Sequence, residues 1–375
     1  MRLQLEPVDT LFFRDGTPFS AESSGPKEVG GLFPPHPASI TGALRAALAR
    51  SNGWSGSGRW PAQLDEAFGP GPDDLGLLSF TGPFLLRNGE PLFPVPLHLQ
   101  GTSEGGGWRP RALLQPGPPV CCDLGSAVRL PDLPDVIRAA EWSELKGGEG
   151  WWLTVLGLEA VLQGRLPEHE ALVPSPDLWR EERRVGIERH QSTRTAIDGL
   201  IYTTRHVRLG QGVSLGVEIA IEASHTSWKA PIGVLPLGGE SRLAECSPWL
   251  HPLKIATPHE AIAASGRLLV VALTPLDLDA DQALGRRPLH DLADARVISA
   301  CLGRPQRIGG WDSLTRSPLP LHSFLPAGSV LFCELPNPGV LADQVSVSSG
   351  LARIGNRQRW GYGLVALGTW TDTPF

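Results

Sequence analysis

Apolar residues alternate or form short runs along most of the chain, a pattern typical of β-strands. The regularity is greatest at Val213, Leu215, Val217, Ile219 and Ile221, which occupy every second position. This spacing places the five side chains on one face of a half-buried strand. Further strands are predicted at residues 3–8, 184–187, 199–209, 267–274, 295–302, 307–311, 329–335 and 364–367.

Helical spacing is confined to a few places. Ile40, Ala43, Leu44, Ala47 and Leu48 recur every three or four residues, which predicts an amphipathic helix. Its expected N-cap is Ser39, with the preceding prolines outside the helix. Shorter helices are predicted at residues 154–162, 260–264 and 340–344.

The order of these elements predicts the domain organisation. At about 150 residues per domain, 375 residues suffice for two domains. Because a new strand begins at residue 267 and few helices follow, we predict α+β domains at 1–264 and 265–375. Residues 51–63 and 101–119 are rich in Gly, Pro and Ser, which predicts surface loops or insertions.

Charge is segregated along the chain. The formal net charge of −6 excludes a general polycation, so any nucleic-acid site must be a local patch. Residues 183–208 carry a balance of +4 and residues 350–370 a balance of +3, which leaves −13 for the rest. The first window holds six arginines against Glu188 and Asp198, namely Arg183, Arg184, Arg189, Arg194, Arg205 and Arg208.

The cysteines and the N-terminus indicate a cytoplasmic protein. No Cys-x-x-Cys pair occurs among Cys121, Cys122, Cys246, Cys301 and Cys333, so we expect buried thiols in a reducing compartment. Glu6 and Asp9 interrupt the apolar stretch that a signal peptide requires, and the aliphatic run 268–273 is too short to span a bilayer. No metal site, cofactor or membrane association is predicted.

The candidate chemistry concentrates near the C-terminus. Four glycines and three arginines (Arg353, Arg357 and Arg359) fall within residues 350–363. Glycine permits a close backbone approach, and the guanidinium fork binds phosphate bidentately. This combination is typical of a loop that binds a sugar-phosphate backbone, and it is no Walker A loop because no Lys-Ser/Thr pair follows. A Gly-rich turn with solvated arginines explains the stretch equally well.

Several phrases together resemble one protein family. They are Leu-Phe-Phe-Arg-Asp-Gly-Thr-Pro-Phe at 11–19, Leu-Phe-Pro-Pro-His-Pro-Ala-Ser-Ile-Thr-Gly-Ala-Leu-Arg at 32–45, Arg-Val-Gly-Ile at 184–187, Gly-Leu-Ile-Tyr at 199–202, Pro-Leu-Gly-Gly-Glu at 236–240 and the Gly-rich stretch. In this order they resemble the third subunit of the Cmr complex, the type III-B CRISPR effector, within the RAMP superfamily. The resemblance runs from residue 3 to residue 370.

The resemblance implies two tandem ferredoxin-like, RRM-like domains with loop insertions. It implies a non-catalytic, RNA-binding subunit of an antiviral ribonucleoprotein. Such a subunit holds the 5′ repeat-derived tag of the CRISPR RNA. Its protein partners are a large polymerase/cyclase-type subunit and the backbone RAMP subunits.

The residues then suggest where RNA binds. An RRM stacks bases on strand aromatics, but these strands carry mainly aliphatic residues, so we expect the loops to bind. Trp360 is expected either to stack on a base together with Tyr362 or to pack in the core. The predicted RNA-binding residues are Arg14, His36 and Ser39 at the first helix, Arg189, His190, Arg194 and Arg205 in the basic window, and Arg353, Gly355, Arg357, Arg359, Trp360, Gly361 and Gly363 in the Gly-rich stretch.

Two other functions stay open. A RAMP endoribonuclease that processes precursor CRISPR RNA needs a general acid and base, and His36, His190 and His206 are candidates although no histidine pair has a distinctive spacing. A protein-only scaffold would use its arginines on acidic protein surfaces. Salt dependence separates the scaffold from an RNA-binding protein. Each phosphate contact with a single strand contributes roughly −0.7 to the slope of log affinity against log salt concentration.

Overall fold

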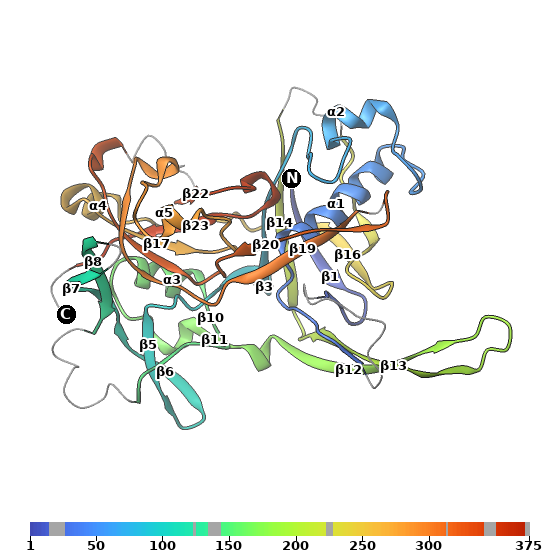
Figure 1. The fold of residues 1–375 in the computed structure, drawn as a ribbon, viewed down its shortest axis with the longest axis horizontal. Coiled ribbons are helices and arrows are strands. Elements are labelled where there is room, and N and C mark those ends of the chain that lie inside the picture. The colour runs from blue at the N-terminus through green and yellow to red at the C-terminus, as the bar shows by residue number, and fades with distance from the viewer. Residues whose placement is uncertain are drawn as a thin grey trace. The chain divides into compact units, whose positions relative to one another are not determined.

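The computed structural model describes residues 1–14, 27–122, 125–133, 144–222, 228–312, 314–340 and 350–371. The chain forms two compact units (Figure 1). Unit 1 comprises Met1–Gly89, Pro176–Leu250 and Arg307–His322, and unit 2 comprises Glu90–Ser175, His251–Gln306 and Ser323–Phe375. The two units are defined by contacts between residues and not by separate folding. The domains at 1–264 and 265–375 therefore remain a prediction.

Unit 1 contains an antiparallel run of strands that begins with the first residues of the chain. Leu3 of β1 lies opposite Val217 on one side and Pro248 on the other, and Leu5 lies opposite Leu215 and Cys246. Both leucines are buried, as the alternation of apolar residues predicts. The strand order is β3 (Leu78–Arg87), β14 (Val213–Ile221), β1 (Arg2–Pro7), β16 (Leu243–Pro248) and β15 (Gly233–Pro236).

The helix α1 (Pro37–Ser51) packs near β3 and β15 of this sheet. Its N-cap is His36 rather than Ser39, so the predicted helix start was wrong. Proline is favourable at the first helical position because it needs no amide hydrogen there, and Pro37 therefore belongs to the helix. Further along, the buried Arg45 donates hydrogen bonds to the carbonyls of Phe68, Gly69 and Gly71.

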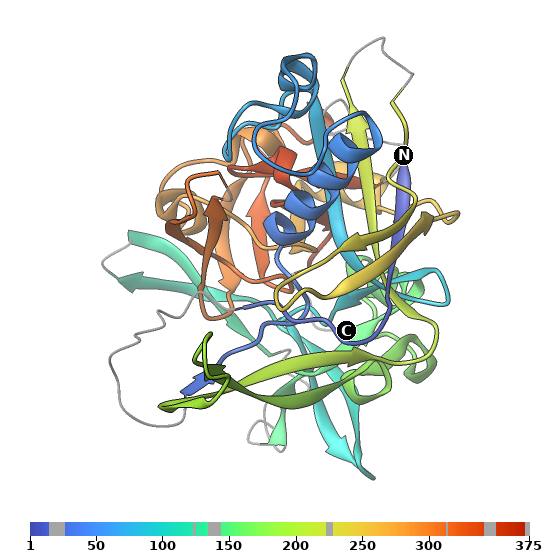
Figure 2. The same cartoon turned by 90° about the vertical axis from the view of Figure 1, so that its right-hand side faces the viewer.

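Two β-ribbons complete unit 1. The long ribbon consists of β12 (Trp179–Arg189) and β13 (Ala196–Leu209), with β2 (Lys27–Val29) parallel to β13. Both views show its two strands running side by side (Figures 1 and 2). β2 pairs with residues 202–204 of β13, and Leu11 forms an isolated antiparallel bridge with Val207. The second ribbon consists of β19 (Gln306–Asp312) and β20 (Ser317–Phe324).

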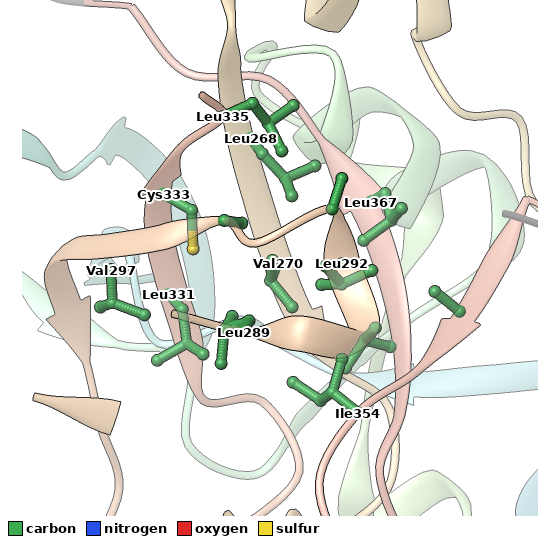
Figure 3. Close-up of a cluster of buried hydrophobic side chains, with 14 of the residues drawn as sticks. Leu268, Val270, Leu289, Leu292, Val297, Leu331, Cys333, Leu335, Ile354 and Leu367 are labelled. Carbon is green, nitrogen blue, oxygen red and sulfur yellow. The ribbon is translucent and has the colours of Figure 1, made fainter. Parts of the chain in front are cut away.

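Unit 2 contains a second antiparallel sheet, which covers an apolar core. Leu268 and Val270 of β17 pack with Leu331 and Cys333 of β21 and with Leu367 of β23 (Figure 3). The strand order is β18 (Arg296–Cys301), β21 (Val330–Glu334), β17 (Arg267–Ala272), β23 (Leu364–Gly368) and β22 (Leu351–Arg353).

The two sheets share one strand order. In unit 1, β1, β3, β14 and β16 are the first to fourth of these strands along the chain. Their order in the sheet is β16-β1-β14-β3, so the first strand lies between the fourth and the third, and the second lies beyond the third. In unit 2 the order β23-β17-β21-β18 repeats this arrangement. All neighbouring strands in both sets are antiparallel.

The stretch 101–119 is not a surface loop as predicted. It contributes to three strands, because Gly105 and Gly106, at φ 58° and 83°, form a tight turn and the prolines that follow are compatible with a two-stranded ribbon. The remaining strands of unit 2 are β4 (Glu90–Pro94), β5 (Leu99–Glu104), β6 (Gly107–Leu113), β7 (Gln115–Cys122), β8 (Gly125–Asp132), β9 (Lys146–Gly147), β10 (Trp151–Leu153) and β11 (Leu172–Pro174).

The shorter helices agree with the sequence patterns. α3 (Val155–Leu162) begins after Thr154, whose hydroxyl accepts a hydrogen bond from the Gly157 amide. α4 (His259–Ser265) lies where a helical patch was predicted. Short helices not predicted are α2 (Asp65–Phe68) and α5 (Ala280–Ala283). Most of the helix predicted at 340–344 lies outside the described residues.

The cysteines fall into two groups. Cys246, Cys301 and Cys333 are buried, as expected, but Cys121 and Cys122 are exposed, so the prediction of buried thiols was wrong for this pair. Both lie at the end of β7, which pairs with β8 in a sheet of two strands within the described residues. In the described part of the chain, no helix is long and apolar enough to cross a membrane.

Candidate functional site

The Gly-rich loop (residues 350–363) lies in unit 2, where two aspartates hold it. A carboxylate oxygen of Asp291 accepts hydrogen bonds from the Gly355 amide, at 2.9 Å, and from Gln358 Nε2, at 3.3 Å. The carbonyl of Asp277 accepts the Asn356 amide at 2.8 Å. Both aspartates are more than 60 residues away in sequence, and no local signal identified them.

The glycines of this loop are required by its own geometry. A Cβ added to Gly355 would lie 2.5 Å from the Asp277 carbonyl oxygen, and one at Gly363 would lie 2.1 Å from that of Ile354. Gly355, Gly361 and Gly363 all have positive φ, which other residues adopt at a cost. Their amides donate to protein acceptors. Side chains, rather than these amides, are therefore the groups that the loop offers to a ligand.

The three arginines of the loop differ in their surroundings. Arg353 donates to the Gln358 carbonyl at 2.7 Å and so contributes to the turn. Arg357 lies 3.3 Å from the Asp277 carboxylate, with 35% of its side chain exposed. Arg359 is exposed in the short 3-10 turn at Gln358–Trp360. Arg357 and Arg359 are therefore the exposed arginines of this loop.

The aromatic residues of the loop are largely packed. Tyr362 is buried, and its ring stacks on Phe324 with centroids 4.6 Å apart. It therefore lacks the exposed face that base stacking requires, and that hypothesis was wrong for Tyr362. Trp360 is half-buried.

The tip of the long ribbon gathers three of the predicted residues. Arg189, His190 and Arg194 are all exposed there. The turn closes through the His190 amide to the Thr195 carbonyl, at 2.9 Å, and the Arg194 amide to the His190 carbonyl, at 2.8 Å. Within the described residues, neither arginine has a carboxylate partner. The ribbon tip is thus a compact basic surface.

Arg205 lies elsewhere, half-buried and opposite Arg183 on the ribbon, with its guanidinium 4.0 Å from the Glu181 carboxylate. Arg189 lies six positions beyond Arg183, so Arg205 is about 20 Å from the tip at roughly 3.3 Å per residue. Between them the ribbon presents three exposed aliphatic residues, namely Val185, Ile187 and Ile201. The ribbon therefore carries basic groups at both ends of an apolar strip.

The segment before α1 approaches Arg205. Arg14 pairs with Gly31 in an isolated bridge, and a Cβ on Gly31 would lie 2.5 Å from the Arg205 carbonyl oxygen. Only glycine permits that approach. The structure thus brings Arg14 and Arg205, which are 191 positions apart in sequence, to one part of unit 1.

The start of α1 offers less charge than expected. His36 makes no side-chain cap, and burial lowers its pKa to about 4, so its ring is neutral near pH 7. Ser39 is exposed in the first turn of the helix, where amide groups and the helix dipole favour an anion. His36 can therefore offer phosphate a hydrogen bond but no positive charge.

An ion network at the base of the ribbon was not anticipated from the sequence. Asp9 lies 3.0 Å from Arg184, 2.9 Å from Arg208 and 3.3 Å from Arg242. The hydrogen bonds from Arg184 and Arg208 lower the Asp9 pKa to about 2. Glu182 pairs with Arg184 and Arg208 as well, so part of the basic window is neutralised locally.

The third candidate histidine of the nuclease hypothesis is buried in this region. The ring of His206 stacks on Phe12 with centroids 5.1 Å apart. Its two nitrogens lie 3.2 Å from the Thr10 hydroxyl and 3.1 Å from the Thr204 hydroxyl. Burial lowers the pKa of His206.

Three aspartates alternate at Asp277, Asp279 and Asp281 in unit 2. Arginines engage their carboxylates: Arg357 contacts Asp277, while Arg287 contacts both Asp279 and Asp281. In the ranges that the structure describes, no group of three His, Cys, Asp or Glu side chains is arranged to hold a metal ion.

Comparison with known proteins adds one strong match. A family model described as CRISPR-associated protein (Cas_Cmr3) matches residues 3–370. No curated protein matches the chain.

Solved structures add weaker similarities. A chain of the cryo-EM structure of the Type III-B Cmr-beta bound to cognate target RNA is 19% identical, with a TM-score of 0.47 over 88% of this chain and 86% of that one. A chain of the same assembly with AMPPnP is 18% identical, with a TM-score of 0.47 over 98% and 99%. The Csm3-Csm4 subcomplex of the type III-A interference complex gives 11% identity and a TM-score of 0.37 over 89% and 93%. These scores are too low to support an argument.

Proposed function

Because this chain belongs to the Cas_Cmr3 family of CRISPR-associated proteins, we propose that it is a non-catalytic, RNA-binding subunit of a type III-B CRISPR ribonucleoprotein. In this proposal it holds the 5′ repeat-derived tag of the CRISPR RNA in the cytoplasm, as part of antiviral defence. It docks against the large polymerase/cyclase-type subunit and the backbone RAMP subunits.

The observation that carries RNA binding is the ribbon tip. A chain with net charge −6 places Arg189 and Arg194 at an exposed turn without carboxylate partners among the described residues. Elsewhere in the same window, Arg184 and Arg208 are paired with Asp9 and Glu182. Unpaired guanidiniums on a protruding turn favour a polyanion, because they release counterions when phosphate replaces solvent.

The Gly-rich loop supplies a second contact surface in this proposal. Arg357 and Arg359 project from a turn whose backbone is fixed by Asp277 and Asp291. A fixed backbone lowers the entropy lost when the guanidiniums bind phosphate. Arg14, Arg205 and Ser39 belong to the same proposed contact set on unit 1.

The strand order supports the proposed fold. Both sheets place the first strand between the fourth and the third, with the second beyond the third, in antiparallel pairing. We propose that they are two ferredoxin-like domains. Their sheet faces carry mainly aliphatic residues, which is consistent with RNA contacts made by loops and ribbon rather than by strand aromatics.

Two double substitutions test RNA binding. The tagged protein is purified from its host, and the co-purified RNA is sequenced; we expect CRISPR RNAs that share one 5′ tag. Arg189→Ala with Arg194→Ala, and separately Arg357→Ala with Arg359→Ala, should each reduce the retained RNA. When affinity for the tag RNA is measured at several salt concentrations, the loss of two phosphate contacts should reduce the slope of log affinity against log salt concentration by about 1.4 in magnitude.

A matched control removes two arginines from another surface. Arg109 and Arg111 on β6 are exposed and lie beside Glu104, so Arg109→Ala with Arg111→Ala makes the same charge change. We expect this control to retain the RNA and the salt slope. Equal behaviour of all three double variants would remove both surfaces from the proposal. Protein partners recovered without CRISPR RNA would favour the scaffold function.

A further inference from the structure

The ribbon β19–β20 carries an exposed tryptophan that the proposed RNA contacts do not use. The indole of Trp311 is 61% exposed. Every other tryptophan, tyrosine and phenylalanine ring among the described residues is buried or half-buried, although the chain contains 12 tryptophans. A large apolar side chain left in solvent at a ribbon end loses the free energy that burial would provide.

Further apolar side chains are exposed on the same ribbon and its turn. Leu314 and Leu321 are 48% and 47% exposed. Leu321 and Leu319 lie across β19 at its glycines: a Cβ on Gly309 would be 2.8 Å from Leu321 Cδ2, and one on Gly310 would be 2.9 Å from Leu319 Cδ1. The absence of side chains at 309 and 310 therefore leaves room for these two leucines to lie against β19.

The edge of this ribbon restricts how a partner binds it. β20 contains Pro318 and Pro320, which have no amide hydrogen. Proline is compatible with strand pairing only where its nitrogen faces away from the paired strand, so the free edge of β20 lacks donors at both positions. A partner strand cannot add there in register, and the side-chain face is the surface available for contact.

Positive charges are exposed on the same ribbon and its turn. Arg307 and Arg316 are exposed, and neither has a carboxylate partner in the described part of the chain. The nearest acid in sequence, Asp312, accepts hydrogen bonds from the Leu314 amide at 2.8 Å and the Thr315 hydroxyl at 2.7 Å. These bonds, above all that from Thr315, lower the Asp312 pKa and commit its carboxylate to the turn.

We propose that the β19–β20 ribbon docks into an apolar pocket, rimmed by Asp and Glu side chains, on another protein subunit of the effector complex. Trp311 fills the pocket, Leu314 and Leu321 cover its edge, and Arg307 and Arg316 pair with the acidic rim. Tryptophan and arginine are the residues most enriched among those that dominate protein–protein binding energy. This proposal rests on the proposed membership in a multi-subunit complex, but it requires no RNA contact by this chain.

The chemistry favours protein over RNA as the partner of this surface. A base stacks on one aromatic ring, whereas Leu314, Leu319 and Leu321 offer no stacking face. A protein pocket accommodates all four apolar side chains, and its acidic rim complements the two arginines.

Site-specific crosslinking identifies the partner. A benzophenone amino acid replaces Leu314, and the effector complex is purified from the host with this subunit and irradiated. We expect an adduct with a protein subunit, on a peptide that contains Asp or Glu. The control places the same group at Leu250 in unit 1, which is 81% exposed. An adduct with RNA, or no adduct above the Leu250 control, would overturn the proposal.

Two substitutions then test the roles of the side chains. Trp311→Ala should reduce the Leu314 adduct at least tenfold, and Arg307→Glu with Arg316→Glu should do the same. Since all three residues are exposed, the melting temperature of the subunit should not change. CRISPR RNA retained in the same preparations is measured as well, because it separates the docking proposal from the RNA-binding proposal. A lost Leu314 adduct with retained RNA supports docking of the β19–β20 ribbon independently of RNA binding. An undiminished adduct in both variants would refute the assigned contacts.

Discussion

A buried histidine in unit 2 makes the stability of this protein sensitive to acid. His98 is 1% exposed, and its ring meets Phe332 edge-on, with centroids 5.9 Å apart. Its Nδ1 atom has no hydrogen-bond partner among the described residues. Burial lowers the pKa of His98 from 6.5 to about 3, because the charged imidazolium loses its hydration in the protein interior.

The sign and size of the effect follow from this shift. As the pH falls below 6.5, unfolded chains bind a proton at His98 that folded chains do not bind, so the free energy of unfolding decreases. The loss continues until the pH reaches the folded pKa of about 3. Between pH 7.5 and pH 4.5 it amounts to about 3 kcal/mol, at about 1.4 kcal/mol per unit. That is a substantial part of the ~5–15 kcal/mol that stabilises a typical protein.

Urea denaturation at pH 7.5 and pH 4.5 measures this contribution by comparison with His98→Leu. Leucine cannot titrate and leaves no buried nitrogen, so the variant should lose about 3 kcal/mol less than the original protein over this interval. His169→Leu is the control, because His169 is exposed. An equal loss in the original protein and in His98→Leu would refute the assignment to His98.

Two further predictions concern the loop and the thiols. Gly363→Ala should destabilise the protein by about 2–4 kcal/mol in a thermal melt, because a residue with φ 72° acquires a Cβ 2.1 Å from the Ile354 carbonyl oxygen. Gly105→Ala, at φ 58° with open space around it, should cost only about 1 kcal/mol, and equal costs would contradict the steric argument. A thiol reagent at pH 8 should modify the exposed Cys121 and Cys122 at once and the remaining three cysteines only after denaturation. Burial raises the pKa of one of these, Cys301, to about 12, and rapid reaction of more than two thiols in the folded protein would contradict the burial.

Local patterns were sufficient to predict many elements. The alternation of apolar residues at 213–221 predicted β14 with its observed bounds, and the spacing of Ile40, Leu44 and Leu48 predicted the buried face of α1. These signals work because side-chain direction depends on the backbone period within a single element. They fail at element ends, as at Ser39, where the N-cap lies three residues earlier because Pro37 is tolerated inside the helix.

The ribbons show where composition misled the prediction. Gly and Pro at 101–119 were taken to indicate loops, yet they form strands, because a glycine turn and prolines at a free edge are compatible with a two-stranded ribbon. The exposed strip of Val185, Ile187 and Ile201 has the composition of a core strand. Whether such residues are covered depends on which elements lie over them, which a local pattern does not contain.

The amino-acid sequence alone established the β-rich class, the segregation of charge into two basic windows, and the family. Only the tertiary structure decided which charges are free to bind. Arg184 meets Asp9 across 175 positions, and the Gly355 amide meets Asp291 across 64. Pairings of this kind depend on how strands are ordered in a sheet, and chain order does not specify them. For that reason, the same arginine-rich window contains neutralised residues at the ribbon base and, at its tip, arginines without a carboxylate partner in the part of the chain that the structure describes.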